Sequence, residues 1–343
     1  MSEELQPLPK GPSQNMVLSL LLYMKVVSSP YGGLLRLQEQ YGDTFPIRVI
    51  GNPGVTIFTG NPQYVKEIFA LHPDRFTMMD THRIQFFFGK RSLFTSEGDT
   101  HQKDKKLIFP HFRGERMRAY ADTILECIRK LCDERLGQGE FSISDLAQSV
   151  TIETMLQALL GVRKPEHLQE LITVFLNWND AQSPFLGIPM LQKNFFKPYR
   201  DFIQTKTNLG NFIQKLIDEN RTGEGGADIL SLMVRSRYED GSAMEDEHIT
   251  DHMRSLFIAG FDTTANTISW GLDTIFRDPE LLARLREEID GIPEDADIDA
   301  MAKLPYLDAT CYELMRLNPP LEIIPTRKLS EPMQLGPYTL EPG

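Results

Sequence analysis

Residues 257–270 read FIAGFDTTANTISW, and they interrupt the pattern of what is otherwise one long, largely apolar helix. Four of these residues, Gly260, Asp262, Thr263 and Thr264, are poor helix formers. Gly costs about 1 kcal/mol relative to Ala in a helix, and the other three cost a few tenths each. A helix that only had to fill a core would have avoided them, so the stretch is a candidate functional site.

The sequence around this stretch predicts a mainly α fold with small β-sheets (α+β). The interrupted helix is expected from about Glu247 to Phe276, a length of about 42 Å at 1.5 Å per residue. Further helices are expected over 279–289 and 305–317, each begun by a proline. A β-hairpin is expected from two alternating runs, 45–50 and 55–59, and a strand, turn and strand at 333–343. Because no linker divides the chain, we expect residues 1–343 to form a single domain.

The net charge of the chain and the length of its apolar run restrict the classes of protein it can belong to. The net charge of −12 over 343 residues argues against a nucleic-acid-binding protein, because neutralising phosphates needs a surplus of Lys and Arg. One basic island, residues 103–118, departs from this balance (Lys103, Lys105, Lys106, Arg113, Arg116 and Arg118 against two acids). The apolar run at 17–27 has eleven residues and contains Lys25, whereas a membrane span needs about 20 residues.

The three cysteines, Cys127, Cys132 and Cys311, have neither CxxC metal-site spacing nor the density of a disulfide scaffold. This usage fits a reducing compartment, so we expect a cytoplasmic protein.

The interrupted helix could carry proton chemistry. A Thr263 hydroxyl inside a helix can take the carbonyl of Ala259 away from the backbone ladder, and Gly260 removes side-chain bulk from the same turn. Together they would form a small groove that holds an alcohol and the Asp262 acid, which could relay protons. The alternative is a structural glycine kink with a solvent-facing Asp262.

Three other places are candidates. His101 and Lys105 are four residues apart and predict a cationic helix face for a carboxylate or phosphate, or simply a solvated face. Glu313 and Arg316 share a helix face and can pair, with partial burial suggested by their apolar neighbours. Arg327 is either a ligand-binding cation or an ordinary cation on an edge strand.

Four motifs then occur in an order that resembles one known family. LPKGP (8–12) before the hairpin, HQKDK (101–105), AGFDTT (259–264) and ELMR with its NPP tail (313–320) look like those of the cytochrome P-450 family of haem-thiolate monooxygenases. The resemblance covers essentially the whole chain. It implies the fold of that family and a haem b cofactor.

The resemblance also implies roles for single residues. Asp262 and Thr263 match the acid and alcohol that deliver protons to dioxygen at the haem, with Ala259 and Gly260 in the groove against the cofactor. His101 and Arg327 match positions that bind a haem propionate. Lys105 stands where the family commonly has Arg, which keeps the charge but loses the forked geometry. Glu313 and Arg316 match a structural pair.

The implied function is insertion of one atom of dioxygen into a lipophilic substrate such as a fatty acid, terpenoid or polyketide. The apolar segments 78–88, 175–190 and 321–324 resemble pocket linings and are equally good core. Electrons would come from a ferredoxin- or flavodoxin-type donor docked on the basic island. Only seven residues precede LPKGP, so we expect no membrane anchor.

One departure concerns the iron. The family holds it through a cysteine thiolate in a loop after the ELMR motif. Here 27 residues follow Arg316 and none is Cys. We therefore expect that the fold is incomplete at its C-terminus. The alternative is a haemless remnant with a binding or regulatory role.

Overall fold

The computed structural model describes most of the chain. The described residues are 8–12, 15, 22, 26, 29–48, 54–78, 81–112, 115–137, 139–162, 164–183, 186, 191–223, 226, 228–293, 298–321, 323–324 and 326–343. They fall into two compact units, the first made of residues 1–83 with 322–343 and the second of residues 84–321. The expectation of a single domain stays a prediction.

The first unit combines small sheets with two helices. Its elements are α2 (Pro30–Tyr41), β1 (Thr44–Ile47), β2 (Thr56–Thr59), α3 (Pro62–Phe69), the short 3-10 helix η1 (Pro73–Arg75), β3 (Phe76–Met78), β4 (Arg327–Leu329), β5 (Met333–Leu335) and β6 (Tyr338–Leu340). The strands pair antiparallel as β1–β2, β3–β4 and β5–β6. Both hairpins expected from the sequence are therefore confirmed in type, although residues 51–53 of the first turn lie outside the described residues.

Local chemistry explains the first unit. Asn61 Oδ1 accepts from the backbone N–H of Gln63 and Tyr64, and Pro62 follows at the first helical position of α3. Phe45 stacks on its cross-strand partner Phe58 with ring centroids 6.2 Å apart. Leu22 and Val26, the described residues of the apolar run at 17–27, pack against this small core.

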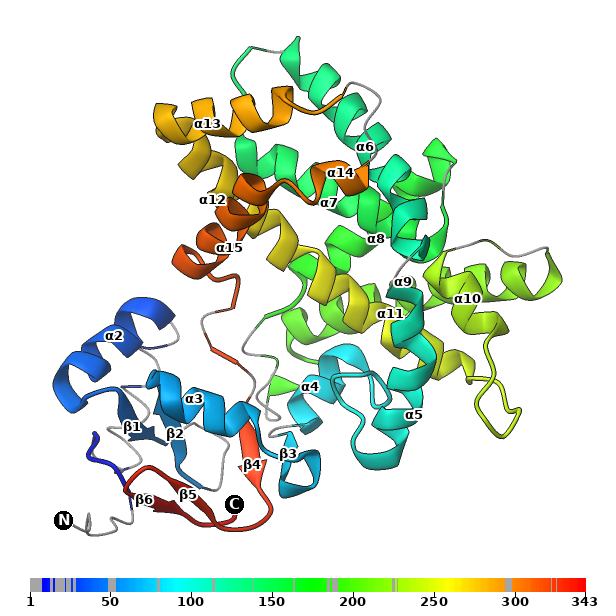
Figure 1. Ribbon diagram of the computed structural model, residues 1–343. Coiled ribbons are helices and arrows are strands. Elements are labelled where there is room, and N and C mark those ends of the chain that lie inside the picture. Colours follow the sequence, from blue (N-terminus) through cyan, green and yellow to red (C-terminus); the bar gives the residue numbers. More distant parts are fainter. Residues whose placement is uncertain are drawn as a thin grey trace. The chain divides into compact units, whose positions relative to one another are not determined.

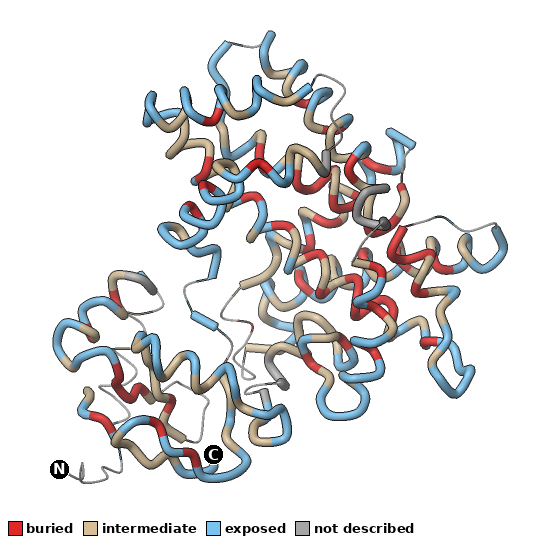
Figure 2. The backbone as a smooth tube through the Cα atoms, viewed as in Figure 1, coloured by how far each residue is buried: buried red, intermediate tan, exposed pale blue. Residues whose placement is uncertain are grey.

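The second unit is helical (Figure 1). Its elements are α4 (Thr81–Phe88, from Ile84 on), α5 (Gly98–Ile108), η2 (Phe109–Phe112), α6 (Glu115–Leu136), α7 (Ile143–Leu160), α8 (Pro165–Asp180), α9 (Lys197–Thr222), α10 (Ile229–Arg235), α11 (Asp246–Gly260), α12 (Asp262–Arg277), α13 (Pro279–Asp290), α14 (Ile298–Met301) and α15 (Pro305–Leu317). Figure 2 shows its buried positions gathered along the central helices. Phe175, Trp178, Phe202 and Phe257 are the largest side chains fully buried there.

The helices follow the sequence signals closely. The expected long helix is present as α11 and α12, with the interruption at Phe261, and α13 and α15 begin at the predicted prolines. The mainly helical fold with small sheets is confirmed. Within the described residues, no helix combines the length and apolar character that a membrane crossing requires.

Candidate functional site

The break between α11 and α12 has the predicted hydroxyl bond. Thr263 Oγ1 donates to the carbonyl oxygen of Ala259, four residues back. Phe261 stands between the helices with φ −80° and ψ −76°. Its N–H still donates to Phe257 O at 3.0 Å, and the Ala265 N–H donates to Phe261 O at 3.0 Å. The ladder therefore continues on both sides while the threonine hydroxyl competes for one carbonyl.

Aromatic packing fixes the position of this break. The Phe175 ring of α8 meets the Phe261 ring edge-on at 5.2 Å and the Phe257 ring at 5.6 Å. Because both sides of the break are tied to one ring, the break is held by the core of the second unit. A Cβ on Gly260 would lie 3.5 Å from Met155 Sδ, an ordinary contact, so packing alone does not require glycine there.

Asp262 and Ala259 are exposed, whereas Thr263 and Gly260 are half-buried. Partial burial, and then the negative charge of Asp180, raise the pKa of the Asp262 carboxyl. The acid therefore keeps its proton to a higher pH than an isolated Asp does. The exposed Asp262 agrees with the alternative of a solvent-facing Asp, and a proton-relaying groove at this turn stays a prediction.

The second candidate lies on α5. His101 is half-buried, and Lys105 is exposed with its Nζ 5.2 Å from the centre of the Phe109 ring. Burial and then Lys105 lower the pKa of the His101 imidazole, against the opposing effect of Asp104. At neutral pH the face therefore carries its charge on Lys105, while His101 offers a neutral N–H donor.

Asp104, between these two residues, escaped the sequence interpretation. It lies in a run with Lys103, Lys105 and Lys106, yet it is buried, accepts a hydrogen bond from Tyr238 and lies close to His252. The spacing of His248 and His252, four residues apart on α11, is a signal that could have pointed to it.

Arg327 lies on β4 in the first unit, whereas the other six predicted site residues lie in the second. Its Nη1 donates to the carbonyl of Ile68 at the end of α3. Its guanidinium lies 5.0 Å from the centre of the Phe69 ring and 4.5 Å from that of Phe76. Burial lowers its pKa. Arg327 thus has firm contacts of its own, and a propionate role for it stays a prediction.

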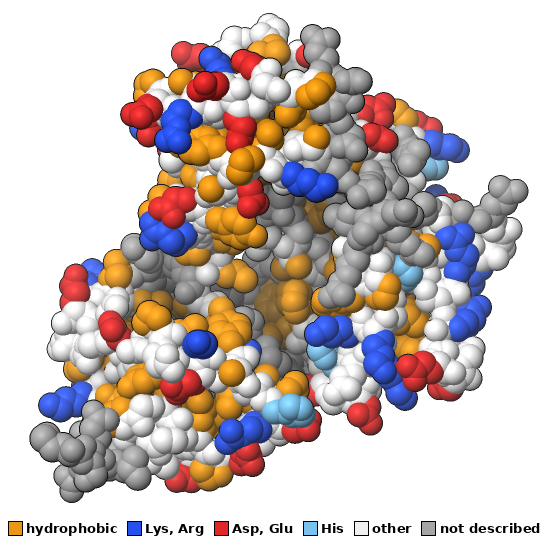
Figure 3. Space-filling view, viewed as in Figure 1, with side chains coloured by type: hydrophobic (Ala, Val, Ile, Leu, Met, Phe, Trp, Pro, Cys, Tyr) orange, Lys and Arg blue, Asp and Glu red, His pale blue; other side chains and the backbone are white. Residues whose placement is uncertain are grey.

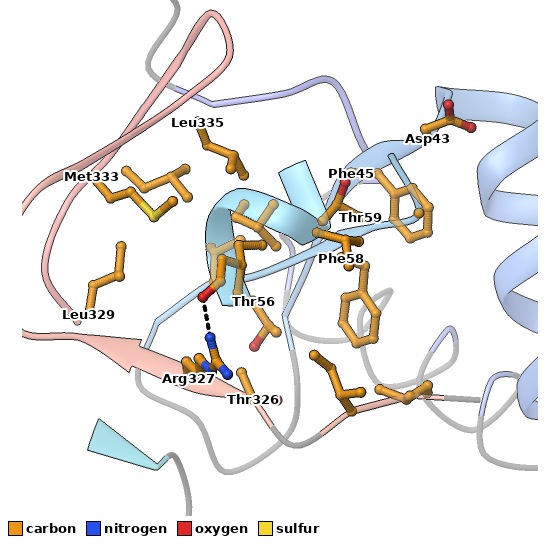
Figure 4. Close-up of a pocket in the computed structure, with 18 of the residues that line it drawn as sticks. Asp43, Phe45, Thr56, Phe58, Thr59, Thr326, Arg327, Leu329, Met333 and Leu335 are labelled. Atoms are coloured by element: carbon orange, nitrogen blue, oxygen red, sulfur yellow. Dashed lines mark hydrogen bonds between the residues drawn. The ribbon is translucent and has the colours of Figure 1, made fainter. Parts of the chain in front are cut away.

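Arg327 also lines an apolar cavity of about 520 Å³ in the first unit (Figure 4). Its walls come from two different sheets, with Ile57 from the β1–β2 pair and Leu329 from the β3–β4 pair. Ile323 and Ile324, from a segment expected to contact substrate, line it as well.

Phe175 and Trp178, from another segment expected to contact substrate, are instead fully buried core. For that segment the core alternative is favoured, and its residues 184–185 and 187–190 lie outside the described part.

Glu313 and Arg316 pair on α15 as predicted. Arg316 donates from Nε and Nη2 to the two carboxylate oxygens at 2.7 and 2.6 Å. The suggested partial burial is wrong, because the side chains are 54% and 66% exposed. Several apolar side chains of α12 and α15 are exposed too (Trp270, Phe276, Tyr312, Met315 and Leu317). Figure 3 shows hydrophobic side chains on the viewed surface of the molecule.

The residues present fit a haem on one side only. A back-bonded threonine beside an acid of raised pKa suits the oxygen side, and His101 with Lys105 suits an anionic haem substituent. None of the three cysteines lies in a loop after α15, where the family holds its thiolate: Cys127 and Cys132 lie on α6, and Cys311 lies on α15. In the described part, no three His, Cys, Asp or Glu side chains are grouped to hold a metal ion.

The basic island is only partly described. Lys103, Lys105 and Lys106 are exposed on α5, and Lys106 Nζ lies 3.4 Å from Glu239 Oε1. Arg113 lies outside the described residues, as do the side chains of Arg116 and Arg118.

A family model and similar known proteins point to the same protein family. The family model described as Cytochrome P-450 matches residues 9–343. The chain is 28% identical over 297 residues to cytochrome P-450 138 of Mycobacterium tuberculosis, covering 83% of this chain and 66% of that protein. It is 25% identical over 322 residues to cytochrome P-450 137 of the same species, covering 90% and 64%. The chain thus spans just under two thirds of the length of these relatives.

Solved structures share the fold. A retinoic acid-bound cyanobacterial protein, CYP120A1, superposes with a TM-score of 0.82 at 19% identity, covering 99% of this chain and 76% of that one. The haem domain of cytochrome P-450DA superposes with a TM-score of 0.79 at 21% identity, with the same coverage.

Proposed function

Because the chain belongs to the cytochrome P-450 family, we propose that it works as a haem-dependent monooxygenase. The reaction would insert one atom of dioxygen into a lipophilic organic substrate, with electrons from a ferredoxin- or flavodoxin-type donor. The observation that supports this most is the helix break at Phe261, where an alcohol and an acid stand together. A bound haem would supply the site for dioxygen and the redox chemistry.

The chain's own contribution is proton handling. Thr263 Oγ1 donates its hydrogen to Ala259 O, so its lone pairs are free to accept a hydrogen bond from a water in the turn. Asp262, whose pKa is raised by burial and Asp180, can hold a proton one residue away and release it to the groove. Ala259 and Gly260 keep that turn small enough for a planar cofactor to approach.

The binding roles follow from charge and exposure. His101 would donate its N–H to a haem propionate, and Lys105 would supply the positive charge. Arg327 would reach a propionate only by giving up its bond to Ile68 O. The exposed lysines of α5 would receive an acidic electron donor in the cytoplasm.

A second function is favoured by one observation, the placement of the cysteines. Since all three cysteines lie on α6 and α15 and none in a loop after α15, the 343-residue chain by itself would be a haem-free protein with a binding or regulatory role.

Reconstitution with haem separates the two functions. We would titrate haem into residues 1–343 and into a chimera in which the part of cytochrome P-450 138 beyond the matched region follows Gly343. The proposal predicts a thiolate-type Soret band for the reduced, carbon monoxide-bound chimera and none for residues 1–343. A folded chimera that takes up no haem would refute the monooxygenase function.

A further inference from the structure

A buried polar cluster joins α5 to the helices behind it. Tyr238 Oη donates to Asp104 Oδ1 at 2.7 Å, and His252 Nε2 lies 3.4 Å from Asp104 Oδ2. The Asp104 and His252 side chains are 1% and 0% exposed. His248, one turn before His252 on α11, has its ring centre 6.4 Å from the His252 ring. The four side chains thus come from three separate segments and meet in the interior of the second unit.

The cluster is held by charge and burial. Burial raises the pKa of the Asp104 carboxyl, but the nearby His252 imidazole and the hydrogen bond from Tyr238 together outweigh it and hold that pKa below its ordinary value. Burial and then Asp104 raise the pKa of Tyr238, so this hydroxyl remains a donor. Burial and then Arg91 lower the pKa of His248, which also faces Glu245. Asp104 is therefore a carboxylate at neutral pH, and its charge is compensated inside the protein.

The cluster contains more buried polar atoms than its hydrogen bonds satisfy, among the residues that the structure describes. In the described part of the chain, Asp104 Oδ2 and all four ring nitrogens of His248 and His252 are buried without a hydrogen bond of ordinary geometry. Leaving such groups buried without a partner costs free energy. If α5 only had to pack against the interior, an apolar residue such as leucine would serve in place of Asp104. The buried carboxylate therefore indicates a role beyond packing.

The position of Asp104 on its helix suggests that role. Asp104 and Ile108 are the buried residues of α5, one turn apart. His101 and Lys105 flank Asp104 on the same helix, and Asp104 raises the pKa of His101 while Lys105 and His252 lower it. The carboxylate that docks α5 therefore also acts on the half-buried imidazole, where it opposes the effects of burial and Lys105 on the pKa.

We propose that Asp104 is a positioning residue: through Tyr238 and His252 it anchors α5 on the interior and so holds His101 in place. This inference rests on the proposed function for its purpose, which is presentation of His101 and Lys105 to an anionic cofactor substituent. The anchor itself is a property of the chain without cofactor.

The test compares D104N with K106Q in residues 1–343 without haem. D104N keeps the shape and removes the charge, whereas K106Q removes the exposed ion pair from the same helix to Glu239, the neighbour of Tyr238. Hydrogen exchange reports the docking of α5, and the NMR titration of the His101 ring reports its protonation. We expect D104N to speed exchange of the α5 amides about tenfold and to shift the His101 midpoint downward. K106Q should leave both unchanged.

Each outcome decides the inference. Unchanged exchange and an unchanged His101 midpoint in D104N would overturn it, and faster exchange with an unchanged midpoint would reduce Asp104 to a structural anchor and overturn the claim about His101. If D104N does not fold, Y238F, which removes a single hydroxyl, replaces it in the test. The inference then requires that Y238F speeds exchange of the α5 amides, and unchanged exchange would overturn it. Haem titration of the chimera is a separate arm: if no variant binds haem, the proposed function fails while the anchor result stands.

Discussion

Lys206 should make the stability of this protein depend on pH in an unusual range. Its Nζ donates to Phe86 O at 2.5 Å and lies 5.8 and 5.9 Å from the ring centres of Phe86 and Phe202. Burial, and then the charge of Arg254, lower its pKa from 10.5 to about 8, with Asp251 opposing. Converted at 1.36 kcal/mol per pKa unit, this shift corresponds to about 3 kcal/mol of cost for keeping the charge.

The sign follows from proton counting. Below pH 8, Lys206 is charged in both the folded and the unfolded chain, so it adds no pH dependence. Between about pH 8 and 10.5 the unfolded chain still holds the proton that the folded chain has lost. Unfolding then takes up a proton, so the free energy of unfolding rises with pH across this window, by at most about 3 kcal/mol.

Urea unfolding of the protein and of K206M across this window measures the effect. The difference in unfolding free energy between the two should change by about 2–3 kcal/mol from pH 8 to 10.5, in favour of the protein with lysine. K197M, on the same helix with a side chain 75% exposed, is the matched control and should show no such change. A flat difference for K206M, or an equal slope for K197M, would refute the reasoning.

Three further predictions concern stability. Gly89 has φ +96° and an added Cβ would overlap the Asp251 carboxylate, so G89A should lose about 2–4 kcal/mol in urea unfolding; a loss under 1 kcal/mol would contradict that packing. His248 has a lowered pKa, so the unfolded chain binds its proton first and stability falls as pH drops below 6.5; H248F should flatten that fall, and an unchanged acid slope would exclude it. The exposed Glu313–Arg316 pair should contribute little, so R316Q in residues 1–343 should keep its Tm, and a clear drop would show that the pair supports this chain.

Much of the fold could be predicted because its signals are local. Asn61 before Pro62 and Asp278 before Pro279 are caps whose hydrogen bonds involve residues two and three positions away, and both helices begin where these caps predict. The break at Phe261 was predictable for the same reason, since Thr263 and Ala259 lie within one turn. Such contacts need no knowledge of the tertiary structure.

The parts of the site that escaped prediction depend on distant contacts. Asp104 reads as a surface residue among lysines, and only Tyr238, 134 positions later, makes it a buried anchor. Arg327 reads as a free cation, yet its partner Ile68 lies 259 positions earlier. Neither pairing leaves a periodic trace in the sequence, because each is set by how helices and strands pack.

Proton delivery at the helix break is the central claim, and one measurement tests it most directly. In the haem-loaded chimera, with dodecanoic acid as the probe, hydrogen peroxide released per dioxygen consumed would be compared for T263V and T274V. Both threonines donate to the carbonyl four residues back, but Thr274 lies three turns beyond the break. The account predicts that T263V releases most of its dioxygen as peroxide, with product formation lowered about tenfold or more, while T274V behaves as the parent. Equal peroxide release by the two variants would contradict it.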